Sequence, residues 1–295
     1  MRREKKERLI RFIFFVLGAS VIVILGMIML FLIIEGMPIF AKVSVFDFLF
    51  GEYWYPTYDP PDFGIFPLIA GSVAVTALSS LIAIPLGIFS VIYLAELAHP
   101  KVRSIIKPII ELIEGLPTVV IGFFGMVILA PILQEYLNLA TGLNLFNASI
   151  MLAFMAVPTI TSVSEDAIYS VPQEVKEASM ALGATHWETI FKVILPASLS
   201  GISTAVILGI ARAIGETMVV LMVAGGAAIV PESIFDPIRP MPASIAAEMA
   251  EAPFRSDHYH ALFGIGLVLF VFTFIFNLIA DYLAEKHKQV GASSL

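Results

Sequence analysis

Two ionisable side chains stand inside a long apolar stretch of the chain. Arg212 and Glu216 are four residues apart within residues 197–224, so a continuous helix would place them on one face, close enough to pair. Charge inside a membrane span is costly and marks either a structural ion pair or a polar pathway. A guanidinium presents a planar fork of donors that matches tetrahedral oxyanions. The residues alone do not decide between a structural ion pair and a polar pathway. A polar pathway that contains Arg212 would indicate an anionic substrate.

The overall composition places this pair in a membrane protein. Of the 295 residues, 59% are hydrophobic and only 14% are charged, with a mean hydropathy of +0.94. Soluble domains contain roughly 45–50% apolar and about 25% charged residues. A soluble enzyme is therefore excluded.

Several kinds of site are excluded as well. The chain has no Cys, which rules out disulfides, thiol nucleophiles and thiolate-bound metals. Asp257, His258 and His260 form a cluster that we interpret as a polar connection beside a membrane helix rather than a metal site. A net charge of −7 and the lack of a basic stripe argue against nucleic acid as a partner. We expect no cofactor and no metal.

Six stretches are apolar enough to cross a bilayer as helices of about 20 residues. They are expected at residues 9–34, 67–94, 105–133, 148–169, 197–224 and 261–283. They predict an all-α, polytopic membrane protein with six transmembrane helices. We expect four parts: a cytoplasmic N-terminus and first helix (1–35), an extracytoplasmic loop (36–66), a five-helix core that includes loop 165–196 (67–283), and a cytoplasmic tail (284–295).

The positive charges predict the orientation of these spans. Lys and Arg gather before the first span, in the second and fourth connections and after the last span, whereas only Lys42, Arg239 and Arg255 fall on the other side. Cytoplasmic loops carry the excess of Lys and Arg. Both termini are therefore expected in the cytoplasm of a multi-pass protein.

Two outer loops differ in character. The first contains an aromatic run around Trp54, which we interpret as an anchor at the membrane interface rather than a substrate contact. The last, residues 225–260, is long, acidic and rich in Pro, and is a candidate for docking a partner outside the cell.

The connection between the fourth and fifth spans, residues 165–196, predicts a short surface helix. Pro172 suits the first turn of a helix, and acidic Glu174 and Glu177 lie near its positive end. Gly183 can end the helix in the left-handed conformation. A second amphipathic turn is expected to follow through Trp187.

The spacing in this connection resembles the EAA loop of ABC importer permeases. The residues are Glu177-Ala178-Ser179, three residues, Gly183, nine residues, Val193, one residue, and Leu195-Pro196. Ser179 and Val193 depart from the usual Ala and Ile. The resemblance implies the MetI-like permease fold and a cytoplasmic coupling helix that docks on a separate ATPase. The coupling residues would be Glu177, Ala178, Ser179, Gly183, Leu195 and Pro196.

A second resemblance is narrower. Residues 211–218, Ala-Arg-Ala-Ile-Gly-Glu-Thr-Met, and residues 114–125 resemble the permease subunits of phosphate-specific importers, and the continuation over residues 218–226 resembles their C-type subunit. This resemblance implies inorganic phosphate as the substrate, with Arg212, Glu216 and Thr217 on its pathway. Arg212 would be a transient charge partner, while Glu216 would orient Arg212 or accept a proton from hydrogen phosphate.

The resemblance also implies partners. No phosphate-cradling P-loop occurs in the sequence, so ATP hydrolysis must come from another subunit and the chain is not an enzyme. The expected partners are an ATPase dimer, a related A-type permease subunit, an extracytoplasmic phosphate-binding protein and the lipid of a prokaryotic inner membrane.

Three alternatives remain. Molybdate or sulfate would also suit an Arg-lined path. A proton-coupled secondary transporter could use Glu216 as its relay. A sensor or scaffold role is compatible with a coupling loop as well.

Overall fold

The computed structural model describes residues 2–286, so most of the expected tail at 284–295 lies outside the described residues. Within that range, six helical segments are long and apolar enough to cross a membrane. They are Lys6–Ala41, Phe66–Leu97, Thr118–Tyr136, Leu145–Tyr169, His186–Ile214 and Asp257–Ala280. The prediction of an all-α protein with six such helices is confirmed, although two of the spans have other bounds than expected.

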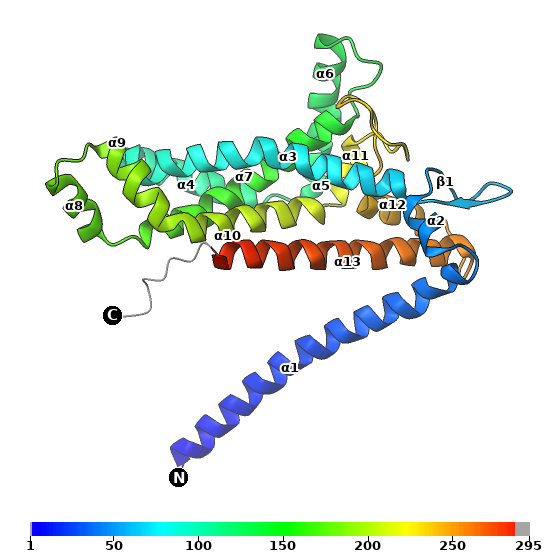
Figure 1. Ribbon diagram of the computed structural model, residues 1–295, viewed down its shortest axis with the longest axis horizontal. Coiled ribbons are helices and arrows are strands. Elements are labelled where there is room, and N and C mark those ends of the chain that lie inside the picture. Colours follow the sequence, from blue (N-terminus) through cyan, green and yellow to red (C-terminus); the bar gives the residue numbers. More distant parts are fainter. Residues whose placement is uncertain (1, 287–295) are drawn as a thin grey trace.

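The first and last helices form a separate pair. α1 (Arg2–Gly36) and α13 (Asp257–Lys286) contact each other where one ends and the other begins, and α1 then diverges from the rest of the molecule (Figure 1). Nearly all apolar side chains of α1 are exposed. A helix that is apolar on all sides and exposed is suited to lipid as its solvent.

The centre of the molecule is built on α7 (Leu145–Tyr169), the most buried of the spans. It packs between α3 (Phe66–Ile92) and α10 (Leu195–Ile214). Close approach depends on small residues, because a Cβ atom added at either Gly87 or Gly209 would lie 2.6 Å from the side chain of Ile160. Small residues of this kind allow helices in membranes to approach closely.

The third span starts later than expected. Residues 105–114 belong to a separate amphipathic helix, α4 (Pro100–Glu114), none of whose residues is buried. The helix is interrupted at residues 115–117. Pro117 has no backbone N–H to donate, and it disfavours the α-helical conformation for the residue before it. The span itself consists of α5 (Thr118–Phe124), a π-helical turn η3 (Gly125–Leu129) and α6 (Ala130–Tyr136). The predicted start at residue 105 is therefore wrong.

The fifth span is also different. α9 (His186–Thr189), a π-helical turn η4 (Ile190–Ile194) and α10 form one helical segment that begins before residue 197. α10 ends at Ile214, and after residues 215–217 the short helix α11 (Met218–Val223) follows. The expected continuous helix over 197–224 is wrong, because it is interrupted two thirds of the way along.

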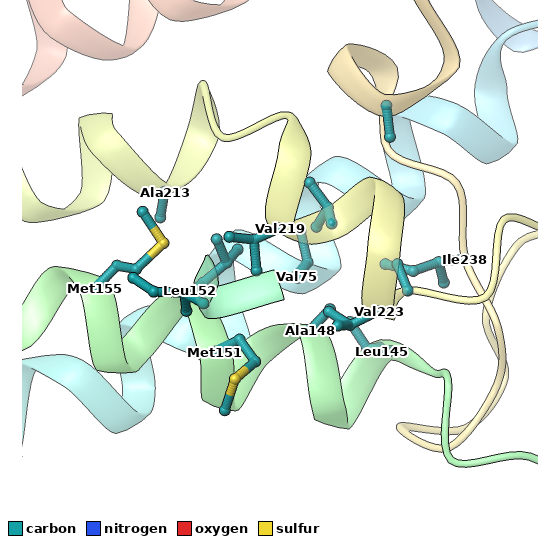
Figure 2. Packing of buried hydrophobic residues seen from close by; sticks show 14 residues of the cluster. Val75, Leu145, Ala148, Met151, Leu152, Met155, Ala213, Val219, Val223 and Ile238 are labelled. Carbon is teal, nitrogen blue, oxygen red and sulfur yellow. The ribbon is translucent and has the colours of Figure 1, made fainter. Parts of the chain in front are cut away.

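Figure 2 shows how this interruption is held in place. Ala213, before the break, and Val219 and Val223, after it, all belong to the buried cluster that includes Met151 and Met155 of α7. Burial of apolar side chains on both sides of the break stabilises a bent path for the chain.

The remaining elements lie at the two ends of the bundle (Figure 1). α8 (Gln173–Ala181) and α9 are at one end, and the end of α13 points the same way, as does the start of α1. The opposite end carries a second group of short elements. They are η1 (Met37–Ala41), α2 (Val45–Phe50), the antiparallel strands β1 (Trp54–Tyr55) and β2 (Asp62–Phe63), and α12 (Met241–Glu248).

Trp54 is not an interfacial anchor, contrary to the expectation. Its side chain is buried, and its indole Nε1 donates to the carboxylate of Glu248 at 3.0 Å. The same carboxylate pairs with Arg239 and, at 2.8 Å, with Nε2 of His258. Glu248 therefore links the loop at residues 36–66 to the loop at residues 225–260, which no local pattern in either loop could indicate.

Candidate functional site

Arg212 lies where three helices meet. It is in the last turn of α10, and its Nη1 donates to Oγ1 of Thr159 on α7 at 3.1 Å. The same nitrogen lies 3.7 Å from Oε1 of Glu114, the last residue of α4. The Thr159 hydroxyl in turn donates to that Oε1 at 2.9 Å. One cation, one hydroxyl and one carboxylate thus form a mutually bonded polar group, which we call the Arg212 cluster.

The local structure explains this meeting point. Arg212 lies in the final turn of α10, where the negative end of the helix dipole favours a cation. Glu114 is held at the junction of α4 and the break at residues 115–117, and its main-chain oxygen accepts from Nη2 of Arg212 at 3.4 Å. Thr159 follows Pro158, which lies inside α7. Each member of the cluster stands beside an irregularity, as is tolerated at membrane depth only inside protein or along a wet cavity.

The two breaks are brought together by close packing. α5 and α11, which follow the two breaks, contact each other. A Cβ atom added at Gly122 of α5 would lie 2.8 Å from Sδ of Met222 on α11. The short helices after the two breaks therefore pack directly against each other.

Glu216 does not pair with Arg212, so the predicted pairing is wrong. Because α10 ends before Glu216, the spacing of four residues no longer sets both side chains on one helical face. Oε1 of Glu216 instead accepts from the backbone N–H groups of Met218 at 3.1 Å and Val219 at 3.2 Å. It satisfies donors at the start of α11 that would otherwise be unpaired.

Thr217 lies within the same break. Its hydroxyl donates to the main-chain oxygen of Gly215 at 3.3 Å. Glu216 and Thr217 are both partly exposed. Glu216 and Thr217 therefore lie together at the break, close to Arg212 in the chain. The side chain of each forms a hydrogen bond to a nearby main-chain group.

The Arg212 cluster is open rather than sealed. The side chain of Arg212 is 31% exposed and that of Glu114 is 36% exposed in this single chain. The cation is partly neutralised by one carboxylate and still presents part of its donor fork. Such an arrangement can exchange its carboxylate partner for another anion.

Sequence analysis missed Glu114 and Thr159. Glu114 carries the same signal as Glu216, an acidic residue within an apolar stretch, and it stands directly before a Gly-Leu-Pro break. Thr159 carries no such signal, because Thr is common within membrane helices.

The second candidate region is the surface loop between α7 and α10. α8 begins directly after Pro172, and Gly183 has a φ of +89°, which confirms the predicted left-handed end. Oγ of Ser179 lies 3.0 Å from Oγ1 of Thr189 on α9 and joins the two short helices. Glu177 and Ala178 are exposed on α8. Leu195 and Pro196 are not beside them in a loop, but begin α10.

The loop that contains α8 and α9 contacts the end of α3 through polar side chains. Nζ of Lys176 pairs with Oε1 of Glu96 at 2.6 Å, and both side chains are largely buried. Glu96 lies in a π-helical turn, η2 (Tyr93–Leu97), and its main-chain oxygen is 3.3 Å from Nε2 of His186. α8 and α9 are thus both attached to one residue, while Leu182 remains 90% exposed.

Comparisons with known proteins identify the family of the chain. Residues 83–289 match the family described as the binding-protein-dependent transport system inner membrane component. The chain is 42% identical to the probable ABC transporter permease protein YqgH of Bacillus subtilis, over 88% of this chain and 84% of that protein. It is 35% identical to the phosphate transport system permease protein PstC of Mesorhizobium japonicum, over 82% of this chain and 79% of that one.

Solved structures share the fold. A chain of the MetNI methionine ABC transporter in an inward-facing conformation has a TM-score of 0.60 and 19% identity, covering 74% of this chain and 94% of that one. The alginate ABC transporter, solved with a periplasmic protein bound to an alginate pentasaccharide, gives a TM-score of 0.63 at 15% identity, covering 93% and 96%. The fold is that of MetI-like ABC permeases, and relatives of this kind are transporter subunits rather than enzymes. The chain therefore belongs to the family of inner membrane components of binding-protein-dependent transport systems, the multi-pass permease subunits of ABC transporters.

Proposed function

We propose that this chain is a permease subunit of an ATP-driven importer of inorganic phosphate. The observation that carries the proposal is the partly exposed guanidinium of Arg212, held by Glu114 and Thr159 where α4 and α10 end beside α7. A guanidinium fork suits a tetrahedral oxyanion. Relatives named as phosphate transport system permease proteins support the same substrate.

Phosphate would pass through the break at residues 215–217. Arg212 would give it a transient charge partner, and Glu216 and Thr217 would lie beside its path. Glu216 would act mainly by holding the start of α11, with its second carboxylate oxygen available to a protonated anion. This assignment replaces the role of orienting Arg212, which Glu114 and Thr159 fill.

ATP hydrolysis in a separate ATPase dimer would act on the loop that contains α8. The contact surface would be formed by Glu177, Ala178, Ser179 and Gly183, with Leu195 and Pro196 carrying the movement into α10. The ion pair between Lys176 and Glu96 would pass the same movement to α3. In this proposal α8, α9 and both termini are cytoplasmic.

The opposite end would face outward and receive phosphate from an extracytoplasmic binding protein. A related A-type permease subunit would complete the pathway. The chain would then divide into a first helix (1–35), an outer loop (36–66), a five-helix core (67–283) and a tail (284–295).

The substrate is tested with the purified complex in liposomes. Uptake of labelled phosphate is measured with ATP inside, against excess sulfate or molybdate outside. The proposal predicts ATP-dependent phosphate uptake that neither competitor inhibits. Uptake of sulfate or molybdate in place of phosphate would assign another oxyanion.

The energy source is tested in the same liposomes. A secondary transporter would take up phosphate without ATP and stop when a protonophore removes the proton gradient. We expect uptake that requires ATP and persists with the protonophore.

A further inference from the structure

We propose that Glu114 is the resting counter-ion of Arg212, and that a substrate anion binds by displacing it. The inference rests on the proposed function, because it concerns the same cation. It adds Glu114, the first residue of the motif at 114–125, to the residues proposed for the pathway.

The contacts fit an exchange of partners. The charged atoms of the ion pair, Nη1 of Arg212 and Oε1 of Glu114, lie 3.7 Å apart, which is longer than a direct hydrogen bond. Both charged groups instead bond to Thr159, which accepts from Arg212 at 3.1 Å and donates to Glu114 at 2.9 Å. When an anion takes the guanidinium, Thr159 can keep its bond to the carboxylate. Glu114 can therefore release Arg212 without losing every partner.

The charges explain why such a counter-ion is useful. An Arg without a partner at membrane depth is costly, so Glu114 stabilises the site while no substrate is present. An arriving anion can bind to Arg212 only by displacing the Glu114 carboxylate. The free energy lost with that ion pair keeps the affinity for the anion low. Weak binding suits a path along which the anion must leave again.

The same carboxylate would select among anions. A protonated oxyanion such as hydrogen phosphate can donate a hydrogen bond to Glu114 once it has displaced it. Sulfate carries no proton at neutral pH, and would face an unpaired carboxylate at close range. Glu114 is therefore a specificity-determining residue of the pathway in this proposal.

The test uses the complete complex and follows Arg212 directly. Phenylglyoxal modifies Arg side chains, and mass spectrometry of the peptide that contains Arg212 gives its modification rate. Inorganic phosphate is then titrated to find the concentration that halves this rate. The variants are Glu114→Gln and, as a matched control, Glu111→Gln, an exposed residue one turn earlier on α4. Elution of the intact complex and its ATPase activity verify that each variant is assembled.

In Glu114→Gln, Arg212 should react faster, and the half-protecting phosphate concentration should fall about tenfold. Sulfate protection should improve more than phosphate protection, because the amide can donate where the carboxylate could not. Glu111→Gln should match the wild type. An unchanged or higher phosphate concentration in Glu114→Gln would overturn the inference about Glu114 alone. If phosphate protects Arg212 in neither protein, the proposed anion site at Arg212 is itself wrong.

Discussion

The guanidinium of Arg212 and the carboxylate of Glu114 form an ion pair although the two residues are 98 positions apart in the chain. The pair joins the end of α10 to the end of α4, and Thr159 of α7 bonds to both side chains. A charge at the junction of three helices couples their positions. Movement of any one of them changes what Arg212 can bind.

Removal of the Glu216 side chain should weaken α11 without disturbing Arg212. Glu216→Ala loses an acceptor for two backbone N–H groups and should lower the free energy of unfolding by about 1 kcal/mol. Glu216→Gln keeps an acceptor oxygen and should stay close to the wild type. Thermal unfolding of the purified complex measures both. Equal losses in the two variants would contradict the capping role.

The Glu216→Gln variant also tests whether Arg212 is held by Glu114 and Thr159 rather than by Glu216. The phenylglyoxal modification rate of Arg212 should be unchanged in Glu216→Gln, since Glu114 and Thr159 hold the guanidinium. A faster modification rate in this variant would show that Arg212 pairs directly with Glu216 after all.

Substitution of Gly122 by Ala should destabilise the packing of α5 against α11. The new methyl group would lie 2.8 Å from Sδ of Met222, which can turn aside, but also 3.3 Å from Cβ of Met222 and from the main-chain Cα of Val219, so α5 and α11 would have to shift slightly apart. Overpacking of this kind costs about 1–3 kcal/mol. Gly26→Ala is the matched control, because nothing lies within 4 Å of a Cβ atom at that position on α1. Unfolding midpoints that agree for both variants would show that the close approach is not needed.

The conformation of Gly183 should matter although no side chain crowds it. Its φ of +89° is unfavourable for Ala, while a Cβ atom there would contact nothing within 4 Å. Gly183→Ala should destabilise the end of α8 by about 1 kcal/mol and reduce co-purification of the ATPase. Gly183→Asn should lose less, because Asn tolerates the left-handed region better. Greater loss with Asn than with Ala would point to a steric contact with the partner instead.

The buried pair of Lys176 and Glu96 should be worth more than an exposed one. A double-mutant cycle with Lys176→Gln and Glu96→Gln should give a coupling energy of about 1–3 kcal/mol. The matched control is the exposed pair of Lys192 and Glu188 on consecutive turns, for which about 0.3–0.5 kcal/mol is expected. Limited proteolysis of the loop as the complex is heated provides the measurement. Similar values for the two pairs would remove Lys176 as an attachment of α8.

Much of this fold could be predicted from sequence because lipid imposes long apolar helices. The six spans and the left-handed Gly183 follow from local composition and local turn chemistry. The interruption at 115–117 has a local signal in Gly115 and Pro117, which the continuing apolar run masked, whereas that at 215–217 could not be located because apolar residues continue on both sides of it. Arg212 was found through its own charge, whereas its partner depends on how α4 and α10 pack. The burial of Trp54 depends likewise on Glu248, 194 positions away.

The most direct measurement of the central claim is ATP-dependent uptake of labelled phosphate by the reconstituted complex carrying Arg212→Gln. Arg11→Gln, an exposed Arg on α1, is the control. The account predicts at least about a tenfold loss of uptake for Arg212→Gln, corresponding to one charged contact with the anion, with the complex intact and Arg11→Gln active. Phosphate uptake at the wild-type rate in a fully assembled Arg212→Gln complex would contradict it.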